Sequence, residues 1–160
     1  MPCLNEEATI EACIKKAKLF ITNNKIDAEI LVADNGSTDN SKSIAINNNV
    51  RVIDVSQKGY GSTLLEGIKN SKGKFVIFAD SDDSYDFSKI APFIAKLNEG
   101  YDLVVGNRFK GGIAKGAMPF SHQYFGNPVI SFLGRIFLKN KIGDFHSGIR
   151  AFNKDKILNL

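Results

Sequence analysis

The sequence lacks the features that mark membrane-spanning, secreted or zinc-binding proteins. No apolar run approaches the roughly 20 residues that cross a bilayer, and the N-terminus has no basic and apolar secretion signal. Cys3 and Cys13 are the only cysteines, and His122 and His146 the only histidines, so we expect no four-ligand zinc site. Two reduced thiols are typical of a cytosolic chain.

The composition is that of one globular domain. The chain has 160 residues, of which 43% are apolar and 24% charged, enough to bury a core. Residues 1–106 carry 12 Lys/Arg and 15 Asp/Glu, whereas residues 107–160 carry 9 and 2. An acidic half suits a metal ion and a basic half suits phosphate or an anionic membrane surface, although ordinary surface charge explains the asymmetry equally well. We find no nucleic-acid-binding motif.

Helix-like and strand-like segments alternate over residues 6–106. Periodic apolar residues predict helices over 6–24, from the turn at 35–38 to about 48, over 60–70 and over 87–99. Apolar runs predict strands over 28–33, 50–55, 74–79 and 101–106. This order predicts an α/β fold with a mostly parallel sheet and helices on both faces. We expect the sheet's first strand to be missing, because the helix over 6–24 starts the series. The Gly-rich stretch 110–121 is a candidate mobile loop.

Polar residues follow three of these strands. Asp34, Asp80 and the pair Asn107-Arg108 each come directly after an apolar run. In open α/β sheets, ligands bind in the crevice beyond the carboxyl ends of the strands. The sequence therefore predicts a binding site where these residues meet.

Asp80 and Asp82 are the candidate metal ligands. Alternation along an extended backbone puts both side chains on one side of the chain. Mg²⁺ or Mn²⁺ prefers oxygen ligands and often binds one or two carboxylates together with substrate phosphates. A solvated acidic turn has the same sequence, so the pattern leaves both interpretations open. Gly59-Tyr60-Gly61-Ser62 precedes a helix, where free N–H groups either meet a phosphate or simply close a tight turn.

Several motifs together resemble a known family. In order and spacing, the segments 2–7, 33–39, 59–61 and 79–82 resemble the family-2 inverting glycosyltransferases of GT-A fold. The segments 106–109, 118–119, 126–127 and 144–152 are similar to the dolichol-phosphate mannosyltransferase-like branch, which moves a sugar from a nucleotide onto a polyprenyl phosphate. The resemblance covers nearly the whole chain and implies one domain over 1–160, with 107–160 as its basic, acceptor-side portion.

The resemblance also implies roles for individual residues. The nucleoside pocket would be lined by Pro2, Leu4, Glu6 and Asp34. Metal and diphosphate would be bound by Asp80 and Asp82, and phosphate groups of donor or acceptor by Arg108 and Arg150. Asp144 would lie near the acceptor, as the base if that acceptor is a hydroxyl. We expect Asp82, Arg108 and Asp144 to be the catalytic residues.

The chain departs from the family pattern at two points. The strand that should precede Pro2 is absent, and Asn35 stands where the family usually has a second acidic residue. The family also continues past residue 160, often into membrane helices, so the sequence resembles a fragment truncated at both ends.

The segment 127–141 has a broad apolar face with basic residues at its C-terminal end. A helix lying at a membrane surface and a helix packed in the core both have this pattern. The first alternative would bring a lipid phosphate to the site and puts the enzyme at the cytoplasmic face of a membrane. His122 and His146 are expected to be structural residues.

The predicted reaction is a single in-line displacement that inverts the sugar. Because a phosphate acceptor is already anionic at pH 7, positioning and electrostatics would dominate catalysis. Two other functions fit parts of the pattern. A sugar nucleotidyltransferase would normally have a Gly-rich, basic N-terminal loop, which residues 2–7 do not provide. A non-catalytic domain that binds nucleotide or lipid is the other alternative, favoured by the missing first strand.

Overall fold

The computed structural model describes residues 1–108, 131–132, 134, 136–137 and 142–158. These described residues do not include the predicted loop at 110–121, His122, the motifs at 118–119 and 126–127, or most of the segment 127–141. Within the described residues, no helix combines the length and the apolar character needed to cross a membrane. The elements, in chain order, are β1 (Pro2–Cys3), α1 (Ile10–Asn24), β2 (Leu31–Asp34), α2 (Ser41–Asn47), β3 (Arg51–Asp54), α3 (Tyr60–Asn70), β4 (Phe75–Phe78), η1 (Phe87–Lys89), α4 (Ala91–Asn98), β5 (Leu103–Val105), β6 (Arg150–Asn153) and α7 (Lys154–Leu158).

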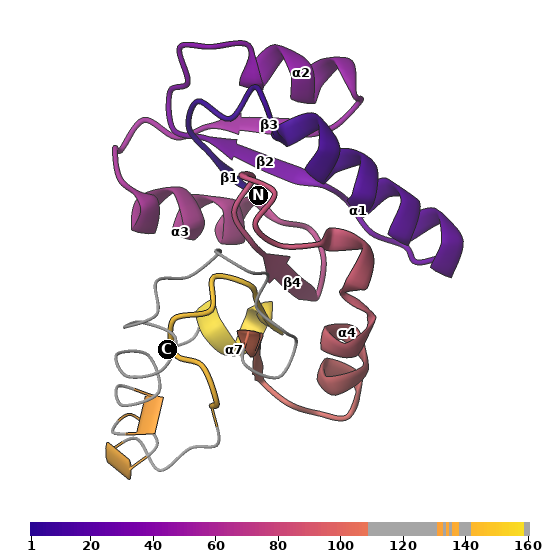
Figure 1. Cartoon of the computed structure of the whole chain (residues 1–160), viewed down its shortest axis with the longest axis vertical. Helices are drawn as coiled ribbons and strands as arrows, with labels where there is room; N and C mark the ends of the chain where they lie inside the picture. The colour runs from indigo at the N-terminus through magenta and orange to yellow at the C-terminus, as the bar shows by residue number, and fades with distance from the viewer. Residues whose placement is uncertain (109–130, 133, 135, 138–141, 159–160) are drawn as a thin grey trace.

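The N-terminal half is a parallel sheet with helices on both faces. Its strand order is β1-β2-β3, and both pairs are parallel. Alternate residues of β2 face opposite ways, as strand geometry requires. Val32 packs in a core cluster with residues of α1 and α2, whereas Ala33 faces Gly67 of α3. Figure 1 shows α2 and α3 on opposite sides of this sheet. The predicted α/β class is confirmed.

The prediction that the first strand is missing is wrong. Pro2 and Cys3 form the short strand β1, which pairs in parallel with Ala33 and Asp34. The backbone pairing extends back to Met1, whose carbonyl accepts a hydrogen bond from Ala33 N at 2.9 Å. The sequence hides this strand because two residues are too few to produce a periodic pattern. The helix predicted from residue 6 begins instead at Ile10, after a turn in which Asn5 has a φ of 59°.

A second sheet contains an element that the sequence pattern did not predict. β6 lies between β4 and β5 and runs antiparallel to both. The sequence predicted parallel βαβ units, and the antiparallel pairing of β6 with both neighbours departs from that expectation in this second sheet. β6 begins at Arg150, so its pairing with β4 joins residues about 75 positions apart.

One predicted helix is two elements. The segment predicted as a helix over 87–99 contains the 3-10 turn η1 and then α4, with a break at Ile90. Pro92 lies in the first turn of α4, where a residue without an N–H is tolerated, but it cannot continue a preceding helix. Asp86 accepts a hydrogen bond from Ser88 N and so caps the first of the two.

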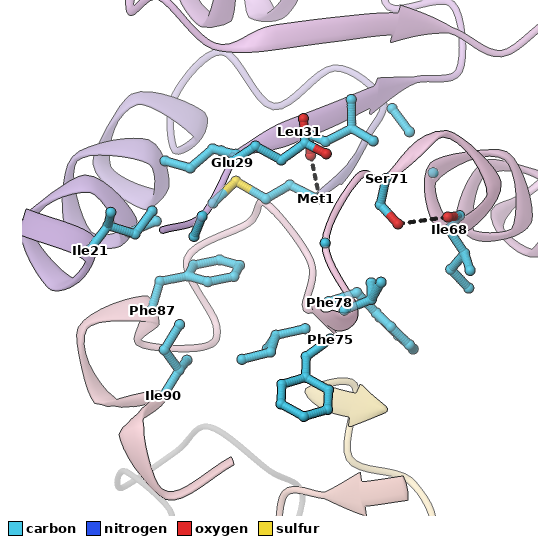
Figure 2. A pocket seen from close by; sticks show the side chains of 18 of the residues that line it. Met1, Ile21, Glu29, Leu31, Ile68, Ser71, Phe75, Phe78, Phe87 and Ile90 are labelled. Atoms are coloured by element: carbon cyan, nitrogen blue, oxygen red, sulfur yellow. Dashed lines mark hydrogen bonds between the residues drawn. The ribbon is translucent and has the colours of Figure 1, made fainter. Parts of the chain in front are cut away.

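The two sheets enclose an apolar cavity of about 350 Å³. Figure 2 shows Met1 and Leu31 on one side of it and Phe75 and Phe78 on another, with Phe87 of η1 and Ile90, which lies between η1 and α4, on a third. The cores of the two halves are joined beside it, because Phe20 and Ala17 of α1 share a buried cluster with Ala79, Phe87 and Ile149.

Candidate active site

A second cavity, of about 320 Å³, lies beyond the carboxyl ends of β1 and β4. It is lined by Pro2, Cys3, Leu4, Glu6, Asn35, Lys58, Gly59, Tyr60, Thr63, Asp80, Ser81 and Asp82. Five of the predicted site residues therefore meet in one place. These are Pro2, Leu4, Glu6, Asp80 and Asp82. The lining does not include the four other predicted site residues, Asp34, Arg108, Asp144 and Arg150.

The loop that carries Asp80 and Asp82 is held from behind by Ser81. The Ser81 hydroxyl is buried and donates to the carbonyl oxygen of Pro2 at 2.7 Å. The Ser81 carbonyl accepts from the Thr9 hydroxyl at 2.8 Å. With the middle residue tied to β1 and α1, the side chains on either side of it reach the cavity.

The third acidic residue of this loop has a different environment. Asp83 adopts a φ of 62° and forms an ion pair with Lys16 of α1, with Nζ to Oδ1 at 2.7 Å. It is not among the cavity-lining residues. Asp82 is exposed, and its Oδ1 accepts from Ser84 N at 2.9 Å. Tertiary contacts thus separate two neighbouring carboxylates into one that faces the cavity and one that anchors the loop.

Asn35 organises the opposite wall. Its buried amide nitrogen donates to the carbonyls of Val55 at 3.0 Å and Gln57 at 2.9 Å, and its amide oxygen accepts from Gly59 N at 2.9 Å. A carboxylate has no hydrogen to donate to those two carbonyls. This explains how an asparagine serves at the position where the family resemblance leads one to expect an acid. Sequence reasoning missed this role, because it depends on contacts with residues 20 to 24 positions away.

Two further side chains of that wall carry polar groups. Lys58 Nζ donates to the Asn35 carbonyl at 2.6 Å, and the Tyr60 hydroxyl donates to Asp80 Oδ1 at 2.7 Å. Burial, followed by the hydrogen bond and charge of Asp80, raises the pKa of Tyr60 well above its usual range. Lys58 was not predicted as a site residue. Its only signal in the sequence is a cation directly before the Gly59-Tyr60-Gly61 turn.

Asp34 lies next to this cavity, deep in the fold. Its side chain is 2% exposed, and Oδ2 accepts from the backbone N–H groups of Gly36 and Ser37, both at 3.0 Å. Its second oxygen, Oδ1, is buried and has no partner among the described residues. An unpaired buried acceptor carries a desolvation cost of about 1–3 kcal/mol, which a donor from a ligand would relieve.

Arg108 and Asp144 form a buried ion pair away from the cavity lining. Arg108 Nε contacts Asp144 Oδ2 at 2.7 Å, and Nη2 contacts Oδ1 at 2.9 Å. Asp144 is fully buried and also accepts from the backbone N–H of Arg108 and of His146. Burial alone would raise the pKa of Asp144, but the hydrogen bonds from Arg108 and the backbone outweigh it and lower that pKa. The geometry favours a carboxylate that holds Arg108 over one that takes a proton.

The segment that contains this ion pair docks against the Asp80 loop. Gly148 N donates to the Tyr85 hydroxyl at 2.6 Å, and a Cβ added at Gly148 would lie 3.0 Å from Asp80 Oδ2. Arg150 donates to the carbonyls of Ser147 and Phe145 at 3.2 and 3.1 Å, and its charge acts on Tyr60. The C-terminal segment is therefore brought close to the acidic loop.

The donor set suits a hard divalent cation together with a phosphate ligand. Both aspartates offer carboxylate oxygens to one cavity, although in the described parts of the chain no group of three or more acidic, histidine or cysteine side chains is arranged to hold a metal alone. Two carboxylates with substrate phosphates and water form the kind of site that Mg²⁺ and Mn²⁺ occupy. That Asp80 and Asp82 bind such an ion stays a prediction.

Comparison with known proteins identifies the family. Residues 1–159 match the family described as glycosyl transferase family 2. The low-salt glycan biosynthesis hexosyltransferase Agl6 of Haloferax volcanii is 35% identical over 97% of this chain. The dolichyl-phosphate hexose transferase of the same organism is 31% identical over 80% of it. The chain spans 38% and 54% of the lengths of these two relatives.

Solved structures agree with this result. Glucosyl-3-phosphoglycerate synthase from Mycobacterium tuberculosis, in complex with Mn²⁺ and UDP-glucose, superposes with a TM-score of 0.73 at 25% identity, over 99% of this chain and 56% of that one. The same enzyme has also been solved with Mn²⁺, UDP and phosphoglyceric acid. On its sequence and its fold, the chain belongs to glycosyltransferase family 2.

Proposed function

We propose that this chain transfers a sugar from a UDP- or GDP-linked donor to a polyprenyl or dolichyl phosphate, with inversion at the sugar carbon and with Mg²⁺ or Mn²⁺ bound at Asp80 and Asp82. The observation that carries the proposal is the polar cavity itself. It gathers two carboxylates at its rim next to Asp34, whose Oδ1 is buried without a partner among the described residues. Both features suit a ligand with N–H or O–H donors at one end and a diphosphate at the other.

The nucleoside end of the donor lies against β1 and β2 in this proposal. Pro2 and the half-exposed Leu4 provide apolar contact for a base, and Asp34 Oδ1 accepts a hydrogen bond from the base or the ribose. Glu6, which also lines the cavity, offers a further acceptor. Lys58, which also lines the cavity, adds a positive charge that favours binding of a diphosphate.

A bound divalent cation would neutralise the negative charge that develops on the departing nucleoside diphosphate. Asp80 and Asp82 hold and orient that end of the donor. An oxygen of the acceptor phosphate forms a bond to the anomeric carbon from the side opposite the leaving group. The bond from that carbon to the diphosphate oxygen breaks with its electron pair, and one displacement inverts the configuration.

Arg108, Asp144 and Arg150 act on the acceptor side. A phosphate acceptor is already anionic at neutral pH, so the reaction needs no strong base, in keeping with an Asp144 that is saturated by hydrogen bonds. Asp144 fixes the Arg108 guanidinium, and Arg108 and Arg150 supply positive charge for phosphate groups.

A lipid acceptor is supported by three independent features. One relative is a dolichyl-phosphate hexose transferase, and residues 107–160 carry an excess of positive charge. Apolar side chains are also exposed on the described part of 131–137, where Phe132, Ile136 and Phe137 are 54%, 55% and 78% exposed. A basic and apolar surface is suited to the cytoplasmic face of a membrane. The structures solved with phosphoglyceric acid favour a second candidate, a soluble acceptor that bears a phosphate.

A matched pair of variants tests the donor site. Asp82→Asn and Asp83→Asn each remove one negative charge from adjacent positions, but only Asp82 lines the cavity. We expect Asp82→Asn to lower the rate of nucleoside diphosphate release with Mn²⁺ present by about 10²–10³-fold, similar to the loss of one transition-state-stabilising group. Asp83→Asn should stay within several-fold of the wild-type rate. An Asp82→Asn variant that turns over like the wild type would contradict the assignment.

The acceptor is tested by adding polyprenyl phosphate, phosphoglycerate or neither to each donor. Sugar transfer to the lipid alone supports the proposal, and transfer to phosphoglycerate alone favours the soluble acceptor. Binding of UDP or GDP without release of nucleoside diphosphate under any condition would favour a non-catalytic domain.

A further inference from the structure

Tyr60 makes an unusual contact for an exposed aromatic residue. It is the first residue of α3, and 53% of its surface is exposed, yet its hydroxyl donates to Asp80 Oδ1 at 2.7 Å. No donor in the described part of the chain is hydrogen-bonded to the second oxygen, Asp80 Oδ2. The tyrosine thus holds one oxygen of a half-buried carboxylate, and the other oxygen, which lies close to Gly148, has no hydrogen-bond donor among the described residues.

The position of the hydroxyl is determined by the turn before the helix. Gly59 has a φ of 122°, a conformation that side chains other than glycine rarely adopt, and its N–H donates to the Asn35 amide oxygen at 2.9 Å. Asn35 is in turn fixed by two carbonyls of the segment after β3. Since the turn is tied to the buried end of β2, the Tyr60 ring leaves α3 from a fixed point on the cavity wall.

Asp80 is held on its other side as well. Gly148 approaches so closely that a Cβ there would lie 3.0 Å from Asp80 Oδ2, and Ser81 anchors the following residue to β1. Of the side chains in the described residues, Tyr60 is the one whose hydrogen bond sets the rotation of the Asp80 carboxylate itself.

We propose that Tyr60 is a positioning residue for the cation site: it orients the Asp80 carboxylate so that its free oxygen can bind the divalent ion. This inference rests on the proposed function, in which Asp80 is a metal ligand. Carboxylates that bind metals are commonly oriented by a hydrogen bond to the oxygen or the face that does not bind, and loss of such a partner typically lowers metal affinity about 10–100-fold.

Tyr60→Phe removes the hydroxyl and keeps the ring. Tyr101→Phe is the matched control, since Tyr101 is 56% exposed and its ring contacts Lys96 far from this cavity. The dissociation constant for Mn²⁺ is measured from the electron paramagnetic resonance signal of free Mn²⁺, in the presence of saturating UDP. We expect Tyr60→Phe to weaken Mn²⁺ binding at least about 10-fold, and Tyr101→Phe to stay within about twofold of the wild type.

Asp80→Ala separates the failure of this inference from the failure of the proposed function. If Asp80→Ala loses Mn²⁺ binding and Tyr60→Phe binds like the wild type, the positioning role is wrong and the cation site stands. If the wild type binds no more Mn²⁺ than Asp80→Ala, both are wrong. The thermal unfolding midpoint of each variant is measured in parallel, and a weakened Mn²⁺ affinity at an unchanged midpoint supports positioning over a general loss of structure.

Discussion

The two cavities of this protein are nearly equal in volume and opposite in chemistry. The cavity of about 350 Å³ between the sheets is walled mainly by aliphatic and aromatic side chains, whereas the lining of the cavity of about 320 Å³ beyond the strand ends includes three carboxylates, one amide and a lysine. Two polar groups of the first are paired within the protein: the Met1 nitrogen donates to Leu31 O, and the Ser71 hydroxyl donates to Ile68 O, as Figure 2 shows. The second lies beside an Asp34 oxygen that has no partner among the described residues.

The volume of a cavity alone therefore does not identify a ligand-binding site. An apolar cavity whose polar groups are already paired has little to offer a charged nucleotide, since its walls cannot replace the water that such a ligand gives up. The polar cavity is lined by carboxylate groups and by Lys58. We therefore expect substitutions in the apolar cavity to change folding stability, and substitutions in the polar cavity to change ligand binding and turnover.

The largest effect is expected from Phe87→Ala. Phe87 is 4% exposed and lines the apolar cavity, so its truncation removes buried apolar surface and enlarges a void. We expect the free energy of unfolding, measured by urea titration, to fall by about 3–5 kcal/mol. Asp82→Asn in the polar cavity should change it by no more than about 0.5 kcal/mol, because this side chain is exposed. A loss below about 1 kcal/mol for Phe87→Ala would contradict the expectation that the apolar cavity contributes to folding stability.

The smallest effect is a gain from Gly67→Ala. Gly67 lies within α3 and lines the apolar cavity, and a Cβ there would meet Ala33 Cβ at 3.5 Å, an ordinary contact distance. We expect a stabilisation of about 1 kcal/mol from helix propensity and packing together. Gly61→Ala, in the same helix but with no neighbouring atom within 4 Å, isolates the propensity contribution. A lower unfolding midpoint for Gly67→Ala would show that the cavity wall has no room.

Much of the N-terminal half could be predicted because its signals are local. The helix predicted over 60–70 is α3, Tyr60–Asn70, and the apolar runs locate β2, β3 and β4 to within a few residues. Spacing within one loop also puts Asp80 and Asp82 in the same cavity. These features depend on periodicity and on turn residues, which a short window of sequence contains.

The remaining features depend on contacts between distant segments. β6 has no strong pattern of its own and becomes a strand because β4 and β5 offer it two free edges. The pairing of Arg108 with Asp144, and of Asp83 with Lys16, joins residues 36 and 67 positions apart. Such pairings are set by packing geometry, and sequence reasoning assigned Arg108 and Asp144 to separate roles without recognising that they bind each other.

By itself, the amino-acid sequence determined the α/β class, the order of the N-terminal elements and the acidic loop at the end of an apolar strand. Only the tertiary structure decided which carboxylates face open space and which are consumed by internal partners. Asp82 and Asp83 are adjacent and chemically identical, and alternation along the chain indicates only that Asp82 shares a side with Asp80. They differ because Lys16 of α1 lies within 2.7 Å of one of them, and the cavity lies before the other.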